Sequence, residues 1–169
     1  MIIYRIKQFY WAVESLYIND DFEILNKYLN DSELNLFMKM SKSERNHSIR
    51  VCKSAMKYID CNNILRINKD IMCKCALLHD IGKSQAKINI LYKSIITILN
   101  SITCGKFLKY NKNKRVINYY NHPQIGVGLL ENIGVKNLDI LNCVRYHHNN
   151  SGAEKNIYLE ILIICDNYN

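Results

Sequence analysis

The side chains best suited to chemistry in this 169-residue chain are its five histidines and two aspartates that accompany them. The histidines are His47, His79, His122, His147 and His148. Asp80 directly follows His79, and Asp166 lies three residues before the last residue given. Neutral imidazole nitrogens and carboxylate oxygens are good ligands for divalent Fe, Mn or Zn. These residue types therefore indicate metal chemistry.

The predicted helices place these polar groups on apolar faces. Residues three, four and seven positions apart share one face of an α-helix. Asp166 thus shares its face with Leu162 and Ile163, and His147 shares its face with Val144. A carboxylate moved away from water without a partner loses several kcal/mol. We expect no lysine or arginine on the same faces, so divalent cations are the simplest compensation, and the set is large enough for two ions.

The elements that carry these residues are predicted to be helices within one all-α domain. One proline and six glycines leave few breaks, and β-strand alternation is sustained nowhere. Helices are expected from Asp31 or Ser32 through Met40, from a Ser41–Glu44 capping box to about Asp60, from Lys69 to His79 with Gly82 as the stop, from Ile88 to Asn100, from Pro123 to Asn132 followed by Gly134, from about Asn137 to His148, and from Asn156 onward.

Composition narrows the class of protein further. The longest apolar runs, such as Ile161 to Cys165, are too short to span a bilayer, and the N-terminal stretch lacks the pattern of a signal peptide. Seven cysteines without a CxxC pair favour free thiols in the core of a cytoplasmic protein over a disulfide framework or a structural zinc site. A net charge of +8 raises the alternative of a nucleic-acid-binding protein, but we expect no stable nucleic-acid complex because only Lys106–Arg115 is locally dense in charge.

That dense segment, KFLKYNKNKR, has two interpretations. One is a solvated basic loop, which is common at protein surfaces. The other is that Lys109, Lys112, Lys114 and Arg115 help to admit a polyanionic substrate, since loops on a rigid scaffold often set specificity. The second interpretation predicts that neutralising these four charges raises KM with little effect on kcat.

Five segments of the sequence resemble the motifs of one known family, the HD-domain metal-dependent phosphohydrolases, and in particular its HDIG subgroup. Leu77–Lys83 (LLHDIGK) is similar to the signature motif. The other segments are Asn46–Val51 (NHSIRV), His122–Leu130 (HPQIGVGLL), Val144–His148 (VRYHH) and Ile164–Tyr168 (ICDNY). The resemblance covers Ser41 to Asn169, and the ordered series H, HD, H, HH, D is more specific than the HD dipeptide.

The resemblance implies a helical bundle with a central metal site and a role for each candidate. His47, His79, Asp80 and Asp166 would hold one ion, and Asp80 would bridge to a second ion held by His122 and His147. For His148 there are three alternatives: a further ligand of the second ion, a partner of a ligand, or a contact of the substrate. Fe or Mn are the expected metals, and Zn, Ni or Mg are alternatives. Asp80, His79 and Lys83 would be catalytic, with Lys83 contacting substrate phosphate; a surface lysine is the alternative for Lys83. Two cations would lower the pKa of a shared water, whose hydroxide would attack phosphorus in line.

Two departures from relatives limit the substrate that the resemblance implies. The sequence after His148 lacks the glycine-rich loop of HD-GYP cyclic-di-GMP phosphodiesterases, and Ser43 stands where some of those enzymes have a glutamate for a third metal. In ligand pattern the chain resembles the symmetrical diadenosine tetraphosphate hydrolases of the HD type. We therefore expect hydrolysis of a phosphomonoester, phosphodiester or phosphoanhydride of a nucleotide or related small phosphate. The alternative is a catalytically silent HD module that binds or senses a nucleotide.

Residues 1–40 lie outside the resemblance. Their aromatic side chains include Phe9, Tyr10, Trp11, Tyr17 and Phe22. Aromatic residues mostly serve packing, so we expect a helical extension laid on the HD domain of residues 41–169. A homodimer interface is the alternative.

Overall fold

The computed structural model describes residues 14, 18–86, 103, 106, 112–148 and 156–169. Within these ranges the structure contains helices and no strand, which confirms the predicted all-α class. The elements are α2 (Phe22–Tyr28), α3 (Asp31–Phe37), α4 (Lys42–Cys61), α5 (Lys69–Leu78), the 3₁₀ helix η1 (Ile81–Gln85), α8 (Lys114–Tyr120), α9 (His122–Asn132), α10 (Leu138–Tyr146) and α11 (Ile157–Tyr168). The helix expected from Ile88 to Asn100 and the aromatic residues up to Tyr17 lie outside the described part. None of the described helices combines the length and the apolar character needed to cross a bilayer.

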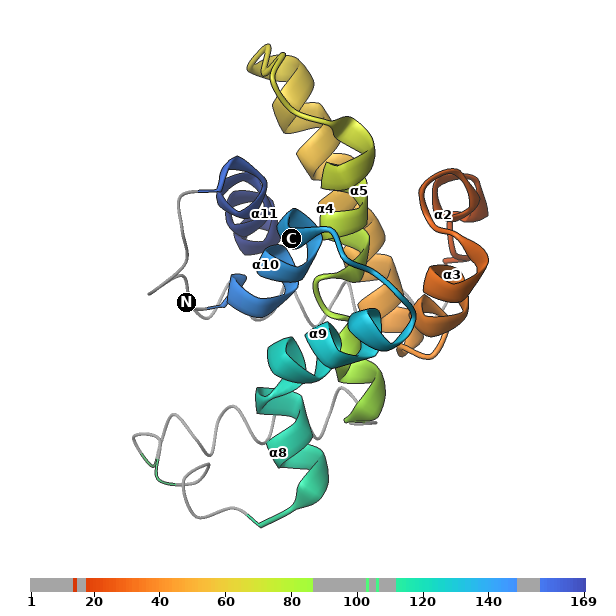
Figure 1. Cartoon of the computed structure of the whole chain (residues 1–169), viewed down its shortest axis with the longest axis vertical. Coiled ribbons are helices and arrows are strands. Elements are labelled where there is room, and N and C mark those ends of the chain that lie inside the picture. The colour runs from red at the N-terminus through yellow and green to blue at the C-terminus, as the bar shows by residue number, and fades with distance from the viewer. Residues whose placement is uncertain (1–13, 15–17, 87–102, 104–105, 107–111, 149–155) are drawn as a thin grey trace.

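Helices α4 and α5 lie side by side and form the centre of the fold (Figure 1). Helices α10 and α11 pack against this pair, whereas α9 packs against α10 and η1. Val51 of α4, Met72 of α5 and Leu162 of α11 are fully buried between them. Burying each such side chain contributes about 1.5–3 kcal/mol, so the central helices form a rigid frame for residues at their ends.

The start of α4 is fixed by the predicted capping box. The Glu44 amide donates to Ser41 Oγ at 3.4 Å, and Glu44 Oε2 accepts from the Ser41 amide at 3.0 Å. These bonds satisfy amides that have no partner within the helix. His47 lies in the second turn of α4, so its position depends on this helix start.

The cap of α3 differs from the expectation. Asn30 caps this helix, rather than Asp31 or Ser32, and the helix ends at Phe37 rather than Met40. Asn30 Oδ1 accepts from the Glu33 amide, and Glu33 Oε2 accepts from the Asn30 amide, each at 2.9 Å. The reciprocal pair forms because a glutamate lies three residues after Asn30. Lys74 Nζ of α5 donates to Glu33 Oε2 at 2.7 Å and ties α3 to the central pair.

The sequence predicts Gly82 as the stop of α5, and the structure shows that this prediction is wrong. The helix ends at Leu78 with His79 as its C-cap residue, and Gly82 lies inside η1. The prediction for α9 is correct: Gly134 follows its end with a φ of 87°. The amide of Gly134 donates to the Glu131 carbonyl and that of Val135 to the Leu130 carbonyl, each at 3.0 Å. This is the Schellman pattern, which favours glycine because of the positive φ.

The six cysteines in the described part are free thiols, as predicted. Five of them are buried, which fits small apolar residues of a core. Cys61 is the exception, because it lies exposed at the last residue of α4. The seventh, Cys104, lies outside the described residues.

Candidate metal centre

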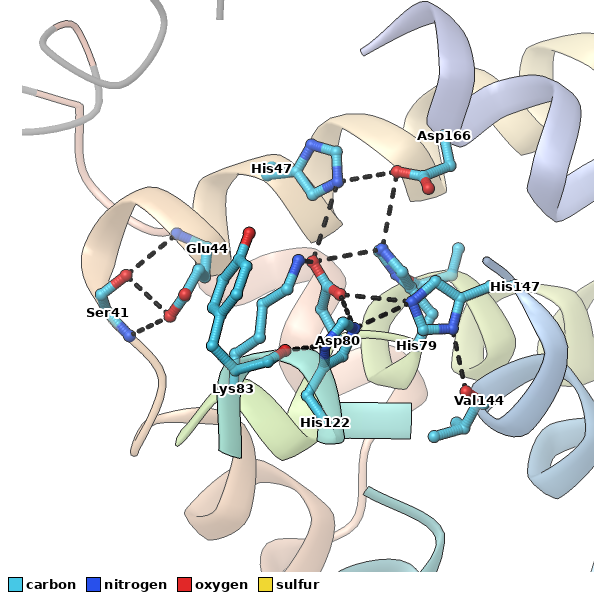
Figure 2. Close-up of polar contacts among 12 residues, drawn as sticks. Ser41, Glu44, His47, His79, Asp80, Lys83, His122, Val144, His147 and Asp166 are labelled. Atoms are coloured by element: carbon cyan, nitrogen blue, oxygen red, sulfur yellow. Dashed lines mark hydrogen bonds and ion pairs between the residues drawn. The ribbon is translucent and has the colours of Figure 1, made fainter. Parts of the chain in front are cut away.

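The predicted metal ligands converge on one buried carboxylate, that of Asp80. Asp80 lies between the end of α5 and the start of η1, and only 1% of its surface is exposed. Figure 2 shows the imidazoles of His47, His79, His122 and His147 gathered around it. The four rings come from α4, the end of α5, the start of α9 and the end of α10. The fold therefore brings together residues that lie up to 100 positions apart along the chain.

One ligand group lies on the Oδ2 side of Asp80. His79 Nε2 is 3.5 Å from Asp80 Oδ2, and His47 Nε2 is 4.0 Å from the same oxygen. Asp166 of α11 completes the group, with its Oδ1 at 2.9 Å from His47 Nε2 and 3.7 Å from His79 Nε2. Atoms that share one ion at about 2.1 Å lie about 3 to 4 Å apart. These four side chains, here called the first ligand group, have that spacing.

A second ligand group lies on the Oδ1 side of the same carboxylate. His122 Nε2 is 3.2 Å and His147 Nε2 is 3.5 Å from Asp80 Oδ1, and the two nitrogens are 3.1 Å apart. The ring of His148 packs against this pair, tilted to His147 and edge-on to His122, with centroids 4.1 Å and 5.0 Å away. A nitrogen of His148 lies close enough to join the other ligand atoms around a single ion. Asp80 thus belongs to both groups, one oxygen to each.

Backbone carbonyls fix the tautomer of three of these histidines. Because a carbonyl can only accept, the Nδ1 that contacts it must carry the hydrogen, which leaves the Nε2 lone pair free for a ligand. Each carbonyl belongs to the last turn of a helix, where it has no partner within the helix. The Nδ1–H groups donate at 2.8 Å from His79 to Ala76, at 2.6 Å from His122 to Tyr119 and at 2.9 Å from His147 to Val144.

This protonation pattern leaves buried acceptors facing one another. The lone pairs of His122 Nε2 and His147 Nε2 meet at 3.1 Å, beside a carboxylate oxygen that also can only accept. His79 Nε2 and Asp80 Oδ1 are buried without any hydrogen-bond partner. Unsatisfied buried acceptors of this kind cost free energy. Divalent cations between them would remove that cost, so the residues present fit bound divalent metal, with two groups of ligand atoms that could each hold an ion.

Lys83 also lies inside the site. Its side chain is 7% exposed, and Nζ donates to Asp80 Oδ2 at 2.5 Å. The alternative of a surface lysine is therefore wrong, and so is our expectation that no cation shares these faces. The 3₁₀ turn of η1 brings Lys83 back over Asp80, a geometry that helix spacing within α5 did not reveal. The Tyr119 ring lies beside it, with its centroid 5.7 Å from Nζ.

The charges at the centre are set by burial and by close partners. Burial by itself would raise the pKa of Asp80, but Lys83 and His79 hold that pKa well below its ordinary value. For Asp166, the hydrogen bond from His47 likewise outweighs burial and lowers the pKa. Burial lowers the pKa of His79 and of His122 despite the attraction of Asp80. Ionised carboxylates and neutral imidazoles are the forms that bind metal.

The residues predicted to admit substrate lie apart from the ligands. Lys112, Lys114 and Arg115 are exposed at and before the start of α8, whereas His122 follows the end of that helix. Lys109 lies outside the described residues. Their role stays a prediction.

Two contributions to the site were missed by the sequence reasoning. Tyr119 holds His122 through its carbonyl and flanks Lys83 with its ring, and its position three residues before His122 was a usable signal. Gly126, noted only as part of a motif, lies against the backbone of Gly82. A glycine inside a predicted helix often marks a close backbone approach.

An all-helical fold with a buried cluster of histidines and aspartates defines a class of metal-binding helical domains. Comparison with family models identifies the family: the HD domain model matches residues 45–169, which is most of the chain. The chain therefore belongs to the HD domain family, whose members are usually metal-dependent phosphohydrolases. No match was found among curated proteins or among solved structures.

Proposed function

We propose that this protein is a two-metal phosphohydrolase that cleaves a phosphoester or phosphoanhydride bond of a nucleotide or related small phosphate. The observation that carries the proposal is the position of Asp80. Its two carboxylate oxygens face separate sets of imidazole nitrogens, at 3.5 Å on one side and 3.2 Å on the other. A carboxylate placed in this way can bridge two ions, an arrangement common to phosphoryl-transfer sites.

Bound divalent ions would lower the pKa of a water molecule to near neutrality and neutralise charge on the phosphoryl oxygens. The protein's own residues do the rest. Asp80 and Asp166 supply negative charge, and their lowered pKa values keep them ionised at neutral pH. His79, His122 and His147 present free Nε2 lone pairs because their Nδ1–H groups are bound to carbonyls.

Lys83 is the residue we assign to the substrate. Its ammonium is held in a buried position beside Asp80, and burial strengthens its attraction for a phosphoryl oxygen. With ions bound at Asp80, the Lys83 ammonium would be available to the phosphate charge that develops in the transition state. Lys112, Lys114 and Arg115 would act earlier, by attracting a polyanion to this side of the molecule.

The free thiols in the described part support a cytoplasmic location, where thiols stay reduced. Among small phosphates in that compartment, we favour nucleotides because Tyr119 offers a half-buried aromatic ring next to Lys83. An aromatic ring can stack on a base.

The proposal is tested with purified protein supplied with Mn²⁺ or Fe²⁺ and a panel of mononucleotides, dNTPs, cyclic nucleotides, cyclic dinucleotides and diadenosine tetraphosphate. We expect turnover of one class and loss of both turnover and bound metal in Asp80→Ala. Asp60→Ala is the matched control, because that aspartate is exposed and pairs only with Lys69 among the described residues. Metal binding without turnover across the panel would instead favour the sensing module. Retained activity in Asp80→Ala would refute the proposal.

A further inference from the structure

Two glycines bring η1 and α9 into direct backbone contact. A Cβ added at Gly82 would lie 1.9 Å from the carbonyl oxygen of His122 and 2.7 Å from the amide nitrogen of Gly126. A Cβ added at Gly126 would lie 3.2 Å from the amide nitrogen of Gly82 and 2.9 Å from a methyl carbon of Val144. A side chain at either glycine would therefore collide with neighbouring atoms. At Gly82 it would meet the backbone of α9, and at Gly126 it would meet Val144 and the backbone of η1.

This backbone contact joins the segment that follows Asp80 to the start of α9, which carries His122 of the second ligand group. Gly82 follows Asp80 by two residues, and the atom nearest to its missing Cβ belongs to His122 itself. Ordinary contact begins at 3.4 Å, so a side chain at Gly82 would push the start of α9 away by about 1.5 Å. His122 Nε2, now 3.2 Å from Asp80 Oδ1, would move with it.

Three of the four members of the first ligand group lie outside this contact. His47, His79 and Asp166 come from α4, the end of α5 and α11, and these helices pack against one another away from α9. A displacement of α9 would therefore separate the two groups and leave the first group assembled.

We propose that Gly82 and Gly126 are positioning residues that set the separation between Asp80 and His122, and thereby the binding of the second ion. The inference rests on the proposed two-metal centre. It assigns a glycine pair to the geometry of the second ligand group in addition to the packing of the helices. Changes of partner atoms around a metal ligand typically weaken metal binding about 10- to 100-fold.

The experiment measures Mn²⁺ bound per chain by equilibrium dialysis of the full-length, metal-free protein, alongside circular dichroism and the melting temperature. Wild type should bind two ions. Gly82→Ala should bind one ion with unchanged affinity and lose the second. Gly126→Ala, whose closest clash is with a side chain, should keep the first ion and bind the second about 10-fold more weakly.

Gly128→Ala is the matched control on the same helix, because nothing lies within 4 Å of the added Cβ. It should bind both ions like wild type. If Gly82→Ala fails to fold, Gly126→Ala decides the question alone. A folded variant of either glycine that binds both ions like wild type, or that loses both ions equally, would overturn the inference. A wild type that binds two ions but turns over no substrate would count against the proposed function and leave this inference standing.

Discussion

The two ligand groups share Asp80 but differ in how the fold supports them. Two members of the first group lie within helices that pack directly on each other: His47 in the second turn of α4 and Asp166 in the last turn of α11. The second group is built from helix ends: His122 begins α9, and His147 is the C-cap residue of α10. His148 follows and is exposed. Residues 149–155 after it lie outside the described part.

In the proposed two-metal centre, this difference predicts that the two ions would be held with unequal strength. A ligand on one of two helices packed on each other keeps its position because buried contacts fix both backbones, whereas a ligand at the first or C-cap residue of a helix depends on fewer contacts. We therefore expect the first group to bind its ion more tightly. The second group would be the one that exchanges its ion or adjusts to substrate.

Removing one histidine from each group gives the largest expected difference. His47→Gln should lose the first ion, and with it most of the binding of the second, because the shared Asp80 loses its partner on one side. His122→Gln should lose only the second ion and reduce turnover by more than the 10- to 100-fold typical of indirect partners. Metal content per chain and kcat measured on the same samples test this. Equal stoichiometry in the two variants would show that the groups are not distinct.

A smaller effect is expected at Lys83, and it should depend on metal. In the metal-free protein Lys83→Met leaves Asp80 buried without its cation, which costs about 3–5 kcal/mol of unfolding free energy. With Mn²⁺ bound the loss should be much smaller, because the ions neutralise Asp80. Urea unfolding with and without metal measures both values.

Lys74→Met is the control for that comparison. Lys74 pairs with the buried Glu33 outside the ligand groups. Its loss should destabilise the protein equally in the two conditions. A Lys83→Met effect that is likewise independent of metal would contradict the proposed exchange of charge at Asp80.

Acidification of the metal-free protein should produce a further, smaller loss of stability. Since the folded pKa values of His79 and His122 lie below the unfolded value of about 6.5, the unfolded chain binds more protons as the pH falls below that value. Each unit of pKa difference costs about 1.4 kcal/mol, present fully only below the folded pKa. The melting temperature should fall as the pH is lowered from 7.5 to 5.5, and His79→Gln should make this dependence on pH weaker. A flat profile in the unsubstituted protein would contradict the lowered pKa values.

The smallest expected effect is at the start of α4. Ser41→Ala removes one half of the capping box and should cost about 1 kcal/mol. Because α4 carries His47, the affinity for the first ion should fall slightly while the second ion is unaffected. Thermal melts and Mn²⁺ titration measure these effects, and Ser41→Asp, which preserves a capping acceptor, should restore both.

The sequence allowed accurate prediction where the signals were local. The Ser41–Glu44 box and Gly134 after α9 follow from spacings of a few residues, and both are present. The apolar faces beside His79, Asp80 and His147 anticipated their burial. Asn30 was missed as the cap of α3 because Asp31 and Ser32, which cap helices about equally well, follow it, although Glu33 three residues after Asn30 was a usable signal.

Contacts made through η1 were missed because the sequence analysis placed a helix stop at Gly82, whereas Gly82 lies inside η1. Lys83 follows the expected stop, but η1 continues through it, and residues three positions apart share one face, so Lys83 returns to Asp80 instead of pointing to solvent. The approach of Gly82 to His122 joins positions 40 residues apart, and only packing of α9 on η1 reveals it. Tyr119 was missed because its bond to His122 is made by its backbone carbonyl and not by its side chain.

The hydrogen bonds from His79, His122 and His147 to helix-end carbonyls have a consequence for how the protein acquires its metal. These rings are already held in their binding orientation, so little side-chain entropy is lost when an ion enters. One divalent ion can then replace another without refolding of the domain. The identity of the bound metal should then depend on which divalent ions are available and on their general affinity order. It should depend less on any distortion of the ligand geometry by the fold.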